Sequence, residues 1–200
     1  MFFGSTEMII FDWDGTLFDS EGEIYRVARR IFERHNLTLS SEKFRHRPNN
    51  GFEWYRTQGV SLSDEELGSS FWELFDTSRC GLMEGALSVL GVFQDRGIPC
   101  GIVSAHPGNQ LLERTLHLDI RRHFDFVIGG ASKKSVVLQE VCQKANRHPR
   151  HTYFIGDLLS DIEEGKEAGV MTVLLAPEDY PHRHHARFHV TKLLDLLRLI

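Results

Sequence analysis

The sequence predicts an α/β protein built on a doubly wound parallel sheet, with a small helical domain inserted into it. Short apolar runs recur along the 200-residue chain, each bounded by Gly, Asp or Ser. Apolar residues at helical spacing fill the gaps between these runs, as in 86–93, 137–142 and 193–200. Strands that alternate with helices indicate a parallel sheet covered on both faces. The predicted strands are 8–11, 101–103, 126–128, 153–155 and 172–175.

One gap breaks this alternation. Roughly 80 residues separate the first predicted strand from the second, and they contain two amphipathic stripes, 24–31 and 67–75, joined by a polar link. A segment this long between two strands indicates an inserted helical domain. We place this cap domain at 20–79, and the Rossmann-like core at 1–19 and 80–200.

The composition of the chain limits the kinds of molecule that the protein is expected to bind. With 41% hydrophobic residues the chain can bury a substantial core, and a net charge of −5 provides no overall positive field for a nucleic acid. The first seven residues lack the pattern of a signal peptide, and no apolar stretch approaches the ~20 residues of a membrane span. Three widely spaced cysteines suit reduced thiols. We expect a cytoplasmic monomer or small homo-oligomer that binds neither membranes nor nucleic acid.

The stretch Asp12-Trp13-Asp14-Gly15 directly follows the first predicted strand. Because side chains alternate along a strand, Asp12 and Asp14 should emerge together where the strand ends, while Trp13 points the other way. Gly15 then allows a sharp turn. Two adjacent carboxylates repel each other unless a cation or a proton is shared between them, which indicates chemistry rather than packing.

Polar residues also follow the other predicted strands. In an open parallel sheet the ligand binds at the carboxyl ends of the strands, so these residues should meet at one edge. Four carboxylates in that set call for a divalent cation, and hard oxygen ligands favour Mg²⁺ together with a bound phosphate. The set comprises Asp12, Asp14, Ser104, Lys133, Lys134, Asp157 and Asp161.

These residues resemble the motifs of the haloacid dehalogenase superfamily of aspartate-nucleophile phosphatases, in its phosphoglycolate phosphatase and beta-phosphoglucomutase branch. The DxDGT motif is matched by Asp12 through Thr16, and a Ser that ends a strand is matched by Ser104. The GDxxxD motif is matched by Gly156-Asp157 through Asp161. Order and spacing both fit, and the resemblance covers most of the chain.

The resemblance implies a Mg²⁺-dependent phosphatase that hydrolyses a small phosphorylated metabolite. Asp12 would be the nucleophile that forms an aspartyl-phosphate, and Asp14 the acid and base. Mg²⁺ would be held by Asp12, Asp14 and Asp157, with Asp161 in support. Thr16, Ser104 and a lysine would bind the phosphate.

Two adjacent lysines compete for that role. We favour Lys134, which opens the helix containing 137–142, near whose positive end an anion is stabilised. Lys133 is the alternative. Two alternative functions also stay open, a phosphomutase of the same superfamily and a non-catalytic regulatory protein that binds a phosphate ligand.

Two further groups of residues have more than one interpretation. Arg45, His46, Arg47 and Arg56 of the predicted cap could contact an acidic or polar substrate, or could form a solvated basic face. The spacing of His182, His184, His185 and His189 could suit a metal, but a surface loop before the last helix is the favoured interpretation.

Overall fold

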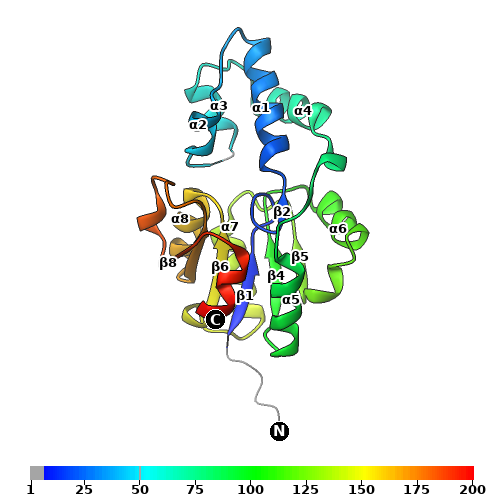
Figure 1. Cartoon of the computed structure of the whole chain (residues 1–200), viewed down its shortest axis with the longest axis vertical. Coiled ribbons are helices and arrows are strands. Elements are labelled where there is room, and N and C mark those ends of the chain that lie inside the picture. The colour runs from blue at the N-terminus through cyan, green and yellow to red at the C-terminus, as the bar shows by residue number, and fades with distance from the viewer. Residues whose placement is uncertain (1–6, 50) are drawn as a thin grey trace. The chain divides into compact units, whose positions relative to one another are not determined.

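A computed structural model describes residues 7–49 and 51–200. The chain forms two compact units, one of residues 1–18 with 82–200 and the other of residues 19–81 (Figure 1). The predicted cap, 20–79, differs from the second unit by one residue at its start and two at its end. The chain crosses between the units at β2 (Phe18–Asp19) and β3 (Gly81–Leu82), which form a separate two-stranded sheet.

The first unit contains a six-stranded parallel sheet in the order β5-β4-β1-β6-β7-β8. The chain runs outward from β1 through β4 to β5, and then returns to the other side of β1 to add β6, β7 and β8. Strand order therefore reverses next to β1, as in a doubly wound fold. The strands are β1 (Met8–Phe11), β4 (Cys100–Val103), β5 (Phe126–Ile128), β6 (Thr152–Gly156), β7 (Met171–Leu175) and β8 (Phe188–Val190).

Both faces of the central strand are buried. Met8 and Ile10 belong to a core cluster with Leu138 of α7, and the alternate residues Ile9 and Phe11 on the opposite face are also fully buried. A strand with helices on both sides has no solvated face, which explains its unbroken apolar sequence.

The helices of the first unit pack in two groups. Helix α7 packs against α8, and α5 packs against the C-terminal turns η5 and α9. The helices are α5 (Ala86–Asp95), α6 (Gly108–His117), α7 (Lys134–Lys144), α8 (Leu159–Ala168) and α9 (Leu196–Leu199), with 3₁₀ turns η2 (Arg121–His123), η3 (Pro149–His151), η4 (Arg183–His185) and η5 (Leu193–Asp195).

The second unit is helical and has its own aromatic core. Phe32 packs against Trp54 and Tyr55, with ring centroids 5.8 and 5.9 Å apart. A capping box between Ser63 and Glu66 starts the fourth helix. The elements are α1 (Glu21–Arg34), α2 (Ser41–Arg45), α3 (Phe52–Thr57), α4 (Asp64–Leu74) and η1 (Thr77–Arg79).

A partly buried ion pair within α1 contacts the end of α4. The Glu23 carboxylate accepts hydrogen bonds from Arg26 Nε at 2.7 Å and from the Asp76 backbone N–H at 2.7 Å. Arg26 also donates to the carbonyl of Leu74 at the end of α4. Its guanidinium lowers the pKa of Glu23. The network therefore ties α1 to the chain that leaves α4.

Two expectations for the C-terminal segment were wrong in part. The stretch from His182 to His189 is not a single loop, because it contains η4 and the beginning of the edge strand β8. Strand β8 pairs with β7, and His189 lies with its Nε2 2.8 Å from the carbonyl oxygen of Ala176. The predicted last helix over 193–200 divides into η5 and the short α9.

Two expectations from composition can be compared with the structure. Within residues 7–49 and 51–200, no helix has the length and apolar character needed to cross a membrane. All three cysteines are free thiols; Cys100 and Cys142 are buried, but Cys80 is only half-buried.

Candidate active site

The carboxyl ends of three adjacent strands position the predicted residues. Asp12 follows β1, Ser104 follows β4 and Asp157 follows β6, and β1 lies between the other two strands. The backbone N–H of Asp12 donates to the carbonyl of Ile155 at 2.8 Å, which continues the sheet one residue past β1. These residues therefore meet at the point where the strand order reverses, where ligands bind in such sheets.

Lys134 bridges two buried aspartates. Its Nζ lies 2.6 Å from Asp161 Oδ1 and 3.0 Å from Asp12 Oδ1. The other carboxylate oxygen of Asp161 accepts the backbone N–H of Leu158 at 3.1 Å. Both oxygens of Asp161 are thus engaged, so this residue holds Lys134 in place beside Asp12.

Burial sets the ionisation of this group. It raises the pKa of Asp12 to about 6, against the opposing effect of Lys134, and the charge of Asp161 adds to the increase. Burial alone would lower the pKa of Lys134, but the carboxylates of Asp12 and Asp161 raise it above its usual value. Lys134 is therefore an ammonium ion.

Three carboxylates lie close enough to share a cation. Oxygen atoms of Asp12, Asp157 and Asp161 are all within 4.8 Å of one another, and two of the three residues are buried. With one lysine among them, two negative charges remain, which one divalent cation would balance. Asp12 Oδ1 is buried without a hydrogen bond, although it contacts Lys134. The carboxylate oxygens of these three residues are hard ligands that fit a Mg²⁺ ion, and Asp12 Oδ1 has no hydrogen bond that would compete with the ion.

The side chain of Asp14 has a different partner. Asp14 Oδ2 lies 2.9 Å from His106 Nδ1, and His106 is only 5% exposed. No motif in the sequence pointed to His106. The available signal was its position two residues after Ser104, at the end of β4, but a single His in a loop has many structural explanations.

Two glycines make room for the carboxylates. Gly15 has φ +75°, and a Cβ atom there would collide with the Asp157 carboxylate. A Cβ atom on Gly156 would collide with the side chain of Asp161. The glycines of the DxDGT and GDxxxD motifs therefore allow the two acidic segments to approach each other.

The remaining predicted residues lie around this group. Ser104 is 2% exposed, and its Oγ accepts the backbone N–H of His106 at 3.2 Å. The hydroxyl of Thr16 lies 3.5 Å from Asp157 Oδ1. Lys133 is turned away, because its Nζ donates to Glu167 at 2.6 Å and its side chain is 56% exposed.

Other candidate residues have local partners. In the helical unit Arg47 is 1% exposed, and it donates to both oxygens of Glu21 at 2.7 Å. Arg56 pairs with Asp64. In the part of the chain that the structure describes, the acidic group is the only set of three or more His, Cys, Asp or Glu side chains placed to share a metal. The histidines of 182–189 form no such set.

Comparison with known proteins agrees with this geometry. Residues 9–175 match the family of haloacid dehalogenase-like hydrolases. The chain is 25% identical to the pyrophosphatase PpaX of Oceanobacillus iheyensis, over 98% of this chain and 97% of the relative. It is also 25% identical to a phosphoglycolate phosphatase of Rhodobacter capsulatus, over 90% and 91%. An N-acetylmuramic acid 6-phosphate phosphatase of Pseudomonas aeruginosa is 24% identical, over 94% and 93%.

Solved structures share the fold. A Lactobacillus plantarum protein described as a candidate phosphoglycolate phosphatase superposes with a TM-score of 0.84 at 21% identity, covering 97% of this chain and 99% of that one. A haloacid dehalogenase-like hydrolase from Streptococcus pneumoniae gives 0.76 at 18% identity, covering 98% of both. The match to the family spans most of the chain and includes the strands that present Asp12, Ser104 and Asp157. The protein therefore belongs to the haloacid dehalogenase-like hydrolases.

Proposed function

We propose that this hydrolase is a Mg²⁺-dependent phosphatase of a small phosphorylated metabolite, and that it works through an aspartyl-phosphate on Asp12. One observation carries the proposal. A buried aspartate lies against a lysine in a group of carboxylates that can hold a metal, and a second aspartate two residues later is paired with a histidine. The phosphatases among its relatives, which match over 90% or more of the chain, support the same class of substrate.

In the first half of the reaction, an oxygen of Asp12 attacks phosphorus. The bond between phosphorus and the leaving oxygen breaks, and Asp14 donates a proton to that oxygen. Lys134 stabilises the charge on the transferring group, in a site where its ammonium is already held by Asp161. The hydroxyl of Ser104 is proposed to hydrogen-bond the phosphoryl oxygens, with Thr16 nearby.

In the second half, a water molecule attacks the aspartyl-phosphate. Asp14, now a carboxylate, accepts the proton from water, and the bond between phosphorus and Asp12 breaks. Inorganic phosphate leaves, and Asp12 and Asp14 return to their starting states. His106 is proposed to hold the Asp14 side chain in one orientation through both steps, because their atoms lie 2.9 Å apart in a partly buried contact.

The carboxylates of Asp12 and Asp157 and the backbone carbonyl of Asp14 would hold the ion, with Asp161 in support through Lys134. When bound, Mg²⁺ supplies positive charge that offsets the repulsion between these carboxylates and an anionic substrate.

The test is hydrolysis of p-nitrophenyl phosphate by the whole protein, with Mg²⁺ and with excess chelator. Activity should require the metal, and Asp12→Asn should abolish it because an amide cannot form the acyl-phosphate. Acid-quenched wild type should carry one phosphoryl group on the peptide that contains Asp12. Asp95→Asn, an exposed aspartate at the end of α5, is the matched control and should keep full activity.

Two results would contradict the proposal. One is wild-type protein that is inactive with Mg²⁺ on p-nitrophenyl phosphate and on a panel of phosphorylated metabolites. The other is an Asp12→Asn variant that retains full activity. Measuring kcat/KM for each metabolite of this panel would also identify the preferred substrate.

A further inference from the structure

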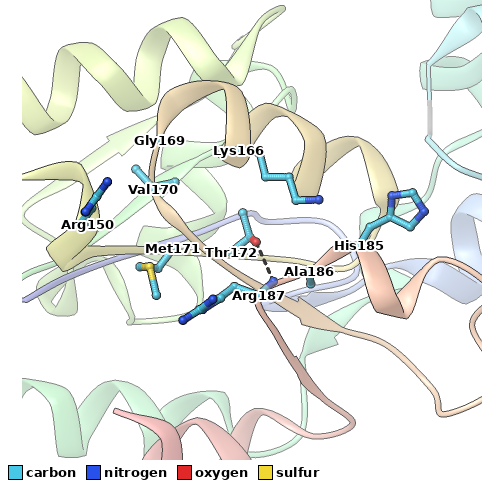
Figure 2. A pocket seen from close by; sticks show the side chains of 9 residues that line it. All are labelled: Arg150, Lys166, Gly169, Val170, Met171, Thr172, His185, Ala186 and Arg187. Atoms are coloured by element: carbon cyan, nitrogen blue, oxygen red, sulfur yellow. Dashed lines mark hydrogen bonds between the residues drawn. The ribbon is translucent and has the colours of Figure 1, made fainter.

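A pocket lies in the sheet unit, at the edge opposite the candidate active site (Figure 2). Arg150 lies in η3, two residues before β6, Met171 begins β7 and Arg187 immediately precedes β8. Because these strands are parallel, their amino ends share one edge, whereas Asp12 and Asp157 follow the carboxyl ends. A strand of five residues, such as β7, separates the two edges by roughly 16 Å.

The pocket is basic. Its volume is about 620 Å³, and Arg150, Lys166, His185 and Arg187 line it, whereas none of the described residues lining it is acidic. Figure 2 shows Lys166 and His185 on one side of Thr172, with Arg150 and Arg187 on the other. The chain as a whole has a net charge of −5, so this cluster is a local reversal of charge.

Two glutamates of α8 that flank Lys166 in sequence are engaged elsewhere. Glu167 pairs with Lys133 at 2.6 Å, and Glu164 accepts the backbone N–H of Ser135, so both engage α7. Lys166, between them in sequence, lines the pocket instead. In the described part of the chain no ion pair is recorded for Lys166 or Arg187. The positive charge of the pocket is therefore available to a ligand.

The pocket also has apolar lining residues, and a hydrogen bond holds part of its backbone in place. Val170, Met171 and Ala186 contribute apolar groups among the cations. Thr172 Oγ1 accepts the backbone N–H of Arg187 at 3.1 Å, which ties the start of β8 to β7 and holds Arg187 at the rim. A ligand that fits this lining has several negative charges and an apolar part.

We propose that this basic pocket binds a nucleoside polyphosphate. Its volume lies within the range of sites for small ligands. Guanidinium groups bind phosphate oxygens through paired N–H donors, and lysine adds a point charge. Met171 and its apolar neighbours offer a surface for the base. The ligand is bound rather than hydrolysed here, since no carboxylate that could hold a metal ion or activate water lines the pocket among the described residues.

The test is calorimetric titration of the whole protein with the β,γ-imido analogue of ATP, in buffer with chelator and no added Mg²⁺. Under these conditions the carboxylates of the active site repel the analogue. The wild type should bind it more tightly than either adenosine or tripolyphosphate, because each of those lacks half of the contacts. Binding should weaken as salt is raised.

The double variant Lys166→Glu/Arg187→Glu should weaken binding by at least about tenfold, since two charge-assisted contacts become repulsive. Arg96→Glu is the control, an exposed arginine at the end of α5 that undergoes the same Arg-to-Glu change as one of the two pocket positions, and it should bind like the wild type. All variants should keep the thermal stability of the wild type and its hydrolysis of p-nitrophenyl phosphate.

Four results would overturn the proposal, and three of them concern the analogue, its fragments and the variants. They are unchanged affinity in the double variant, an equal loss in Arg96→Glu, and binding of tripolyphosphate as tight as that of the nucleotide analogue. Binding of a single-stranded oligonucleotide without binding of the analogue would also overturn it. Because the readout is affinity without metal, failure here would leave the proposed phosphatase activity untouched.

Discussion

His106 Nδ1 lies 2.9 Å from Asp14 Oδ2, in a contact between the loop that follows β4 and the loop that follows β1. His106 is 5% exposed, and its backbone N–H is held by Ser104 Oγ. A side chain fixed in this way limits the orientations of the carboxyl group that is proposed to move the proton. The same loop thus provides both the proposed phosphate ligand Ser104 and a positioning residue for Asp14.

The first prediction concerns this pair. We expect His106→Ala to lower kcat/KM for an alkyl phosphate by about tenfold or more, because a misoriented Asp14 protonates the leaving oxygen poorly. With 2,4-dinitrophenyl phosphate, whose leaving group needs no proton, the loss should be much smaller. Steady-state kinetics with both substrates measures the difference.

Controls separate positioning from folding. His106→Asn retains a group that can hydrogen-bond Asp14 and should recover part of the activity. His117→Ala, at the exposed end of α6, should behave like the wild type. An equal loss on both substrates would mean that His106 acts on the fold of the loop and not on proton transfer.

The second prediction distinguishes the two lysines. Lys134→Ala should lower kcat/KM by about 10²- to 10³-fold, because the phosphoryl group loses its buried cation. Lys133→Ala should leave kcat/KM unchanged and reduce stability by less than about 1 kcal/mol, since it breaks only an exposed pair with Glu167. Circular dichroism and thermal unfolding would check that both variants are folded. Similar, mild losses for both would argue against Lys134.

The third prediction uses two glycines with similar backbone conformations. Gly15 and Gly97 have φ +75° and +66°, but only at Gly15 would a Cβ atom meet another residue, the carboxylate of Asp157. Both alanine variants should lose about 1 kcal/mol of stability through backbone strain. Gly15→Ala should in addition lower kcat/KM by about 10²-fold, because Asp157 is displaced. If Gly97→Ala were equally inactive, the clash with Asp157 would not be the cause.

The fourth prediction concerns the pH dependence of the helical unit. Arg26 lowers the pKa of Glu23 below its usual 4.5, so the folded state favours the carboxylate. Its stabilising effect is therefore fully present above pH 4.5, and is lost as the pH falls through the lower, folded pKa. At pH 7, Glu23→Gln should lower the free energy of unfolding by about 1 to 3 kcal/mol.

Amide hydrogen exchange in α1 and α4 measures this change in the helical unit alone. The difference between wild type and Glu23→Gln should stay constant from pH 7 to about pH 5, and should shrink as the pH falls below 4.5. A difference that grows on acidification would contradict the assignment of Glu23 as a stabilising carboxylate. Glu53→Gln, on the exposed start of α3, should show no pH-dependent difference.

Much of the sheet could be predicted because its signals are local. Five apolar runs marked five strands of the large sheet to within one residue at either end, namely β1, β4, β5, β6 and β7, since buried parallel strands need continuous apolar sequence. Strand β8 was missed because Phe188 and Val190 are separated by His189 in a segment rich in histidine. That strand exists through its pairing with β7. The feature that stabilises β8 is therefore its pairing with a strand that is distant in sequence, and not a pattern in its own residues.

The sequence by itself determined which groups meet at the carboxyl edge of the sheet. Asp12, Ser104 and Asp157 each follow an apolar run, and parallel topology brings the ends of such runs to the same edge. Only the tertiary structure showed which of Lys133 and Lys134 lies beside Asp12, because Lys133 is the extended N-cap of α7 and the docking of this helix brings Lys134 to Asp12. The tertiary structure also determined that His106 contacts Asp14 and that the residues of the basic pocket lie together. Each of these groups involves loops whose distance from one another depends on how the whole sheet is packed.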